Sequence, residues 1–419
     1  MSNFPRLLRI RQDFPHPAPL DLRTTLAAEF QKLRPRIKPG ARIAVGVGSR
    51  GITNLKAIVA EVLALLRAAG AQPFIFPAMG SHGGATPEGQ TGILASYDIT
   101  EQSMATSIRA SLEVKQVGVT ADGKPVWCSL EALGADGILL VNRVKPHTDF
   151  HGDIGSGLLK MAVVGLGKRA GAAAMHLAAS ELGHERAIRT MAGVLIREAP
   201  IIGGISILEN QFHETARIVA MPREEIETGE DALLVEARRL MPLLPFDEID
   251  LLIVDYIGKN ISGTGMDPNV IMRSIDGYSS HLRRDGRPSP FIRRIFVRDL
   301  TPETHGNAIG IGLADLTTTR LMRAMDPRIS FINAMTALTP QSGKLPIYFD
   351  TDREIIERAL ASVPLADTAA AKVVRIADTL SLVEMDISET LWAEVKARPE
   401  ITKLGEPREL QFNGEGNLA

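Results

Sequence analysis

Two residues able to carry covalent and metal chemistry, Lys160 and His176, lie sixteen positions apart in a glycine-rich stretch. Lys160 follows Ser156-Gly157 and precedes an apolar run that could bury its stem. A buried lysine is costly unless it is paired, deprotonated or covalently consumed. His176 stands among alanines, which leave its imidazole sterically open to a metal. The stretch predicts a reactive lysine and a ligating histidine; a surface lysine and a plain helix-face histidine are the alternatives.

Glycines and cations follow this lysine in the segment Gly165-Leu-Gly167-Lys168-Arg169, just before an alanine-rich helical pattern. Backbone amides at a helix start, together with two cations, suit a phosphate group. The pattern is weak by itself, and it predicts at most a cofactor phosphate held near Gly165, Gly167 and Lys168.

Three histidines upstream are candidates for acid–base catalysis. His82 lies between glycines in the segment Gly80-Ser-His-Gly-Gly84, where no bulky neighbour shields its imidazole. His147 and His151 lie in the segment that starts at Lys145-Pro146, directly after a predicted strand. An imidazole titrates near neutral pH and is therefore suited to proton transfer. We expect His82 and one of the other two to face a cleft.

Cationic and polar loops elsewhere predict contacts with an anionic ligand. Arg50 lies in a GxGxxG segment that starts at Gly46 and follows a strand, and a guanidinium there suits a carboxylate or a phosphate. A dinucleotide site is disfavoured because no acidic residue ends the next strand. In the second half, the glycine-rich loop from Gly258 to Asn269 carries Lys259 and predicts a further ligand contact.

The elements that must position these residues alternate between short β-branched runs and longer helical patterns, which predicts α/β architecture with largely parallel sheets. Predicted strands lie at 42–48, 73–77, 137–142 and 251–257. Helices are predicted at 54–69, 223–240, 352–361 and near 314–325, and Thr86-Pro87 is typical of a helix start with Thr86 as its cap. Ligands bind at the carboxyl ends of such strands. We expect an N-terminal cofactor-binding domain over residues 1–243, a C-terminal domain over 244–419 whose last residues could pack back on the first, and an active site in the cleft between them.

Composition excludes several other classes of protein. The 419 residues carry a formal charge of -2, which provides no electrostatic footprint for nucleic acid or an anionic membrane. A single cysteine, Cys128, excludes internal disulfides and cysteine-based zinc sites. No apolar run is long enough to span a bilayer, and the N-terminus lacks a signal-peptide core. We expect a cytoplasmic protein with no nucleic-acid or membrane partner; its oligomeric state stays open, a homo-oligomer included.

Taken together, the pattern resembles the nickel-pincer-dependent lactate racemase family. The resemblance is strongest from Arg42 to His176 and recurs over the loop that ends at Asn269. It implies Arg50 as the ligand of the substrate carboxylate and His82 as an acid–base catalyst. It further implies Lys160 as the covalent tether of the cofactor, in a Ser-Gly-x-x-Lys segment, and His176 as the nickel ligand.

The implied cofactors are nickel and a pyridinium-thioamide-thiocarboxylate mononucleotide, which a set of cofactor-synthesis enzymes would supply. The implied activity is that of an isomerase, a racemase or epimerase that acts on a 2-hydroxy acid by reversible hydride transfer. Two departures stand out. His147 lies thirteen residues before Lys160 and His151 nine, whereas the family's second histidine lies ten before its lysine. The family's Tyr-Gln pair and lysine after Asp-x-Asn are also replaced, which leaves Lys259 and Asn269 as the substrate contacts and indicates a substrate other than lactate.

Two alternatives from other classes remain open. Lys160 or Lys259 could form a Schiff base with pyridoxal phosphate, with Lys168 and Arg169 on the phosphate. The protein could instead bind a carboxylate without catalysing a reaction.

Overall fold

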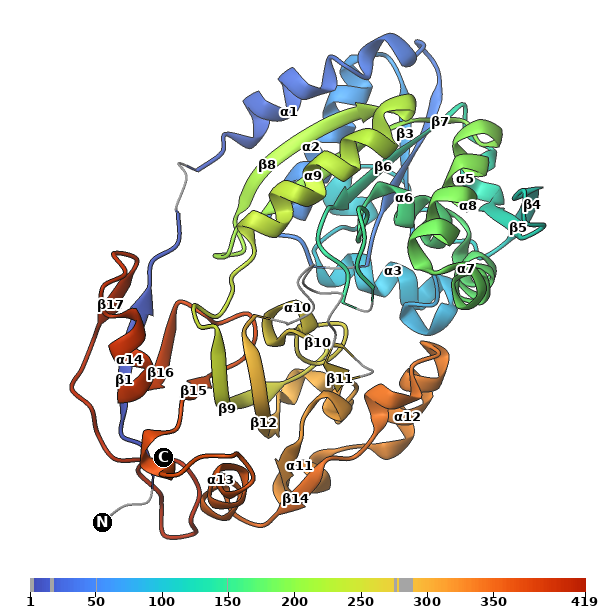
Figure 1. Cartoon of the computed structure of the whole chain (residues 1–419). Helices are drawn as coiled ribbons and strands as arrows, with labels where there is room; N and C mark the ends of the chain where they lie inside the picture. Colours follow the sequence, from blue (N-terminus) through green and yellow to red (C-terminus); the bar gives the residue numbers. More distant parts are fainter. Residues whose placement is uncertain (1–3, 16–18, 50, 149, 275–276, 279–288) are drawn as a thin grey trace. The chain divides into compact units, whose positions relative to one another are not determined.

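The computed structural model describes residues 4–15, 19–49, 51–148, 150–274, 277–278 and 289–419 (Figure 1). Arg50, the expected carboxylate ligand, lies outside the described residues. The chain divides into two compact units, which are described separately below. The N-terminal unit comprises Pro17–Met241, and the C-terminal unit comprises Pro242–Ala419 together with Met1–His16.

A five-stranded sheet forms the centre of the N-terminal unit, in the order β3-β2-β6-β7-β8. The first four strands are parallel, and β8 is antiparallel to β7. A separate hairpin joins β4 to β5. The strands are β2 (Arg42–Val47), β3 (Gln72–Pro77), β4 (Val114–Val119), β5 (Pro125–Ser129), β6 (Gly137–Arg143), β7 (Ile201–Glu209) and β8 (Thr215–Pro222).

Helices cover both faces of this sheet because its strands are apolar on both sides. Along β2, Ile43 and Val45 join the core cluster of α1 and α2, whereas Ala44 joins that of α6 to α9. This alternation follows the two-residue period of a strand. The helices are α1 (Leu22–Phe30), α2 (Leu55–Ala68), α3 (Pro87–Ser96), α4 (Glu101–Met104), α5 (Leu130–Leu133), α6 (Leu158–Lys160), α7 (Lys168–Leu182), α8 (His184–Glu198) and α9 (Ile226–Leu240), with a π-helical segment over Met161–Leu166.

The C-terminal unit contains an eight-stranded mixed sheet in the order β14-β13-β12-β9-β15-β16-β1-β17. Its first five strands are parallel, and the remaining pairings are antiparallel. The strands are β1 (Leu7–Gln12), β9 (Glu248–Ile257), β12 (Phe291–Leu300), β13 (Leu316–Thr318), β14 (Ile347–Phe349), β15 (Val373–Ile376), β16 (Glu384–Ser388) and β17 (Ile401–Lys403), with a short pair β10 (Arg273–Ser274) and β11 (Gly277–Tyr278).

Both ends of the chain belong to the C-terminal unit, in contrast to the expected boundaries. β1 inserts between β16 and β17, and its Leu8 and Ile10 are buried in that unit's core. At the other end, Leu418 is buried in a second cluster of the same unit, and its carbonyl accepts a hydrogen bond of 2.9 Å from Arg298. Arg298 also binds Asp255 and the buried Asp352, each at 2.8 Å. The apolar residues near each terminus explain this placement, because they are buried in the core clusters of this unit.

The helices of the C-terminal unit pack on both faces of its sheet, and the two α/β units confirm the predicted fold class. They are α10 (Pro268–Ile271), α11 (Thr319–Ala324), α12 (Pro327–Thr336), α13 (Asp352–Ala361) and α14 (Glu389–Val395). In the described part of the chain, none of the helices combines the length and apolar character needed to cross a membrane.

Candidate functional site

Three neighbouring parallel strands of the N-terminal unit bring the predicted site residues to one edge of the sheet. β3, β2 and β6 lie side by side and run in the same direction. β2 leads into Ser49, β3 into the His82 loop and β6 into Lys145 and His147. The carboxyl ends of parallel strands meet at one edge, which is where open α/β sheets bind ligands. Sequence analysis could predict these site residues because each of them follows a strand that the sequence pattern identifies.

The loop between β6 and α6 is closed by backbone pairing, and this fixes where the helix carrying Lys160 begins. Lys145 and Ser156 exchange two backbone hydrogen bonds of 2.8 Å. At the next residue, the Gly157 carbonyl accepts a hydrogen bond of 2.9 Å from the Asn142 side chain. The predicted residues Ser156 and Gly157 therefore act here through their backbone, as the last positions before α6.

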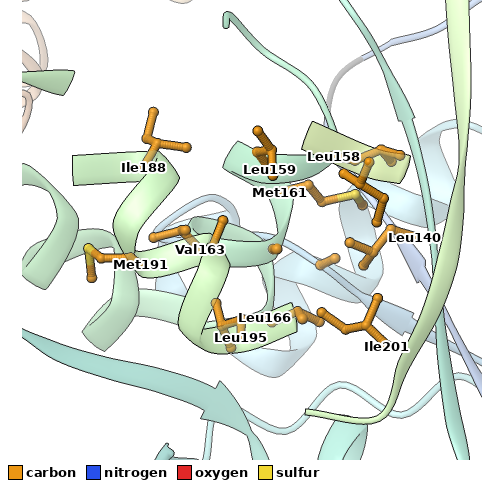
Figure 2. Close-up of a cluster of buried hydrophobic side chains, with 14 of the residues drawn as sticks. Leu140, Leu158, Leu159, Met161, Val163, Leu166, Ile188, Met191, Leu195 and Ile201 are labelled. Atoms are coloured by element: carbon orange, nitrogen blue, oxygen red, sulfur yellow. The ribbon is translucent and has the colours of Figure 1, made fainter. Parts of the chain in front are cut away.

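Lys160 is half-buried, although the residues on either side of it are deeply buried. Figure 2 shows Leu158, Leu159 and Met161 pointing into the apolar cluster that also contains Leu140 and Ile188. These contacts hold α6 and the π-helical segment against the sheet and α8. The Lys160 side chain consequently projects from a rigid support, which is what a covalent attachment point requires.

A buried carboxylate from α9, Glu230, holds the start of α6. Its side chain is fully buried and accepts a hydrogen bond of 3.0 Å from the Leu159 amide. A Cβ atom on Gly157 would lie 2.3 Å from the Glu230 carboxyl carbon, so only glycine fits there. Burial raises the pKa of Glu230 to about 7, against the opposing effect of the Leu159 and Leu158 amides.

Sequence analysis missed Glu230, although a signal for it exists in the helical pattern. Ile226, Leu233, Leu234 and Ala237 form the buried stripe of α9, and Glu230 falls on the same stripe. A carboxylate at a core position of an amphipathic helix is rare and usually paired. Its partner Leu159, in the first turn of α6, lies 71 positions earlier in the chain, so the sequence pattern does not identify the pair.

The π-helical segment that follows Lys160 packs tightly against the loop that carries His82. A Cβ on Gly165 would lie 2.8 Å from the Ala78 carbonyl oxygen, and one on Gly80 would lie 2.7 Å from Val164 and 3.2 Å from Ala172. π-Helical turns are rare and occur often at functional sites. The missing side chain of Gly165 thus allows the π-helical segment to approach Ala78 closely. The segment thereby brings the helices of Lys160 and His176 against the His82 loop.

His147 lies directly against Lys160. Its Nε2 atom forms a hydrogen bond with the Lys160 ammonium. The imidazole also stacks on Phe150 with ring centroids 4.3 Å apart, and Phe150 stacks in turn on His184 at 5.0 Å. Stacking fixes the plane of the His147 ring, so its nitrogen is held at the position of Lys160.

His151 lines a depression of about 550 Å³. Phe150, His184 and Arg189 line the same depression. Arg189 is bound there by Glu185, Glu227 and Asp231 at 2.8–3.0 Å, and these carboxylates raise its pKa. For His147, the structure describes a contact with Lys160.

His82 is exposed and forms a hydrogen bond through Nδ1 with the Ser49 hydroxyl. Tyr97 donates to the Ser49 carbonyl at 2.9 Å, which fixes the segment that carries this hydroxyl. Ser49 thereby orients an imidazole, a group that is suited to proton transfer near neutral pH. Thr86 caps α3 as the sequence predicted, since its hydroxyl accepts from Gly89 at 3.0 Å.

Lys168 occupies a place that its predicted phosphate role does not fit. The side chain is fully buried, and its ammonium donates to the Pro77 carbonyl and to Gln90 Oε1, the latter at 3.1 Å. Burial lowers its pKa to about 8. Lys168 has a positive φ of 52° at the start of α7, which turns the side chain into the protein. Gly167 at this junction lies against the Val163 carbonyl, so it too serves packing.

His176 lies on α7, one turn beyond Ala172, and is partly buried. Ala172 is the residue that approaches Gly80, so this face of α7 is the one directed at the His82 loop. Among the described residues, no group of three or more His, Cys, Asp or Glu side chains is arranged to hold a metal ion. The His176 imidazole could supply one donor to a metal.

Lys259 and Asn269 belong to the C-terminal unit, in the loop after β9. The Lys259 ammonium donates to the Gly263 carbonyl at 2.9 Å, and the Asn269 amide donates to Asp267 at 3.0 Å. These bonds give the loop a defined shape. Their part in a substrate site remains a prediction from the sequence.

Comparisons with known proteins identify the fold. No family model matches the sequence, and no curated protein matches it. Among solved structures, the chain is similar to the lactate racemase apoprotein from Thermoanaerobacterium thermosaccharolyticum, with a TM-score of 0.51 and 12% identity over 90% of this chain and 99% of that one. A protein from Thermotoga maritima, a structural genomics target, is similar at the same TM-score and identity over 88% and 99%. The chain therefore has a lactate racemase-like α/β fold.

Proposed function

We propose that this protein is a racemase or epimerase of a 2-hydroxy acid that works with a nickel-pincer nucleotide attached to Lys160. The single observation that carries the proposal is the contact between His147 and Lys160. Lys160 ends α6, and the π-helical segment that follows it packs against the His82 loop. The fold it shares with the lactate racemase apoprotein supports the same class of reaction.

The residues of this chain have separate roles in the proposal. Lys160 would be the covalent attachment point of the cofactor, and His176 would supply one imidazole to nickel, a donor that suits this metal. When bound, the cofactor would supply a hydride acceptor for the hydrogen on the substrate's α-carbon. Ser156 and Gly157 set the start of the lysine's helix, while Gly165 and Gly167 allow the close packing around it.

Proton transfer falls to the two histidines. A racemase needs an acid–base group on each side of the reacting carbon, so that the hydroxyl proton can be removed for either enantiomer. His82, oriented by Ser49, and His147, oriented by Phe150, are the two candidates. We choose His147 over His151 because the contact of its imidazole with Lys160 places it beside the proposed attachment point. Removal of a general acid–base group typically costs a factor of about 10² to 10⁴ in rate.

Substrate binding is assigned on the sequence pattern alone. Arg50 would hold the carboxylate through a bidentate pair of hydrogen bonds, so that the planar keto acid reorients without escaping. Lys259 and Asn269 would contact the rest of the substrate. The replaced residues of this loop favour a hydroxy acid larger than lactate, with sugar acids as the first compounds to test.

The test requires protein produced together with the cofactor-synthesis enzymes. We expect intact mass spectrometry to show an adduct confined to Lys160 and metal analysis to show about one nickel per chain. Lys160→Arg keeps the charge and Lys160→Ala removes it, and neither variant should carry the adduct. Wild-type protein without adduct and nickel under these conditions would sink the proposal.

Turnover is measured with a panel of 2-hydroxy acids labelled with deuterium at the α-carbon. Inversion with retention of the label is expected, because a hydride returns to the carbon from which it came. Washout of the label to solvent would instead indicate abstraction of a proton. Loss of a coloured species after borohydride treatment, with a new mass on lysine, would favour the pyridoxal phosphate alternative. That alternative places Lys168 on the cofactor phosphate, whereas its ammonium donates to Pro77 and Gln90 inside the protein.

A further inference from the structure

Two buried polar side chains, Lys168 and Gln90, gather the backbone carbonyls of the His82 loop. Gln90 is fully buried, and its amide nitrogen donates to the Met79 carbonyl at 3.0 Å and to the Gly80 carbonyl at 3.1 Å. The His82 carbonyl lies 3.5 Å from the same nitrogen. Lys168 donates to the carbonyl of Pro77, at the start of this loop.

The two side chains are also joined to each other, since the Lys168 ammonium donates to Gln90 Oε1 at 3.1 Å. Lys168 is the first residue of α7, the helix of His176, and it directly follows the π-helical segment after Lys160. Gln90 belongs to α3, on the far side of the His82 loop. The pair therefore connects the loop to the helices on both sides of it.

A lysine is an expensive choice for this position. Its ammonium is removed from water and lies 5.6 Å from the Phe76 ring centroid, a contact that offsets only part of the cost. An apolar residue of similar volume, such as methionine, would avoid the desolvation. What methionine cannot do is donate hydrogen bonds to Pro77 and Gln90.

We propose that Lys168 and Gln90 form a positioning brace that holds the His82 loop at a fixed distance from the helices of Lys160 and His176. The brace acts through the backbone of residues 77–82 and touches no reacting atom. Gly80 and Gly165 complete it, because their missing side chains let the loop and the π-helical segment meet. This inference rests on the proposed role of His82 in catalysis.

The substitutions Lys168→Met and Gln90→Met test the brace, because each removes hydrogen-bond donors and keeps a side chain of similar volume. Leu26→Ala on α1, fully buried in the other core cluster of the unit, is the matched control for a general loss of stability. Hydrogen–deuterium exchange of the protein without cofactor reports on the amides of residues 78–86. We expect exchange there to rise about tenfold or more in both methionine variants, and in Leu26→Ala to change no more than in the rest of the unit.

Activity supplies a second, independent measurement in cofactor-loaded protein. A misplacement of about 1 Å can cost about 10² in rate, so kcat should fall roughly 10- to 100-fold while KM stays within about twofold. Unchanged exchange in the loop of both variants would overturn the brace, as would unchanged kcat. If Lys168→Met does not fold, Gln90→Met decides the question. An inactive, nickel-free wild type would reject the proposed function, whereas the exchange measurement would still decide whether the loop is braced.

Discussion

Replacement of Glu230 by glutamine is the sharpest perturbation that the structure suggests. The carboxylate is fully buried under the first turn of α6, and burial raises its pKa from 4.5 to about 7. Glutamine has the same shape, and its carbonyl oxygen can still accept the hydrogen bond from Leu159. The substitution therefore removes the titration while preserving the packing around Lys160.

The sign and size of the effect follow from linkage. Between pH 4.5 and 7 the folded protein retains a proton that the unfolded chain has released, so the wild type loses stability as pH rises through this window. A shift from 4.5 to about 7, at about 1.4 kcal/mol per unit, amounts to about 3 kcal/mol. Asp231 and Arg189, which also act on this carboxyl, are present in both proteins. The advantage of Glu230→Gln should therefore grow by about 3 kcal/mol across the window.

The assay is urea unfolding of both proteins from pH 4.5 to 8, in a Trp392→Phe background. The chain has two tryptophans, Trp127 in the N-terminal unit and Trp392 in the C-terminal unit, so this background reports on the unit that contains Glu230. The quantity of interest is the difference in unfolding free energy between variant and parent at each pH. A difference that stays constant within about 0.5 kcal/mol would refute a buried, titrating carboxylate at this position.

Two further predictions concern neighbouring parts of the same unit. Gly157→Ala places a Cβ atom 2.3 Å from the Glu230 carboxyl carbon, and this overlap should cost about 1–3 kcal/mol in urea unfolding. The loss should shrink in a Gly157→Ala, Glu230→Ala double variant, and strict additivity would contradict the contact. Cys128 is fully buried and its pKa is raised to about 12, so a thiol reagent at pH 8 should leave it unmodified until the protein is denatured. Rapid reaction of the native protein would show that the strand β5 opens readily.

Local patterns in the sequence were sufficient for the fold class and most elements. The apolar run at 42–48 forms β2, and the helical spacing at 54–69 forms α2. The helix start predicted at Thr86-Pro87 is the start of α3. Each of these depends on residues close together in the chain, so spacing alone identifies it. The segment near 314–325 was less clear: Leu316–Thr318 forms strand β13, and only the following residues form α11.

Domain membership of the termini could not be predicted in the same way. β1 finds its partners nearly four hundred residues away, in β16 and β17. Strand pairing over such a separation depends on which apolar faces remain uncovered after the rest of the sheet has formed. A local pattern contains no information about that choice.

For the candidate site, sequence alone determined which residues have the right chemistry. Lys160 and His82 were singled out by residue type, by glycine neighbours and by their position after strands, and His147 and His151 were left as alternatives. Tertiary structure decided how they are held: His147 against Lys160, and Glu230 under the helix start. It also reassigned Lys168, because the groups that enclose its ammonium, Pro77 and Gln90, come from segments 91 and 78 positions away. The chemical type of a side chain is known from the sequence, whereas its burial and its hydrogen-bond partners are decided only when distant segments pack together.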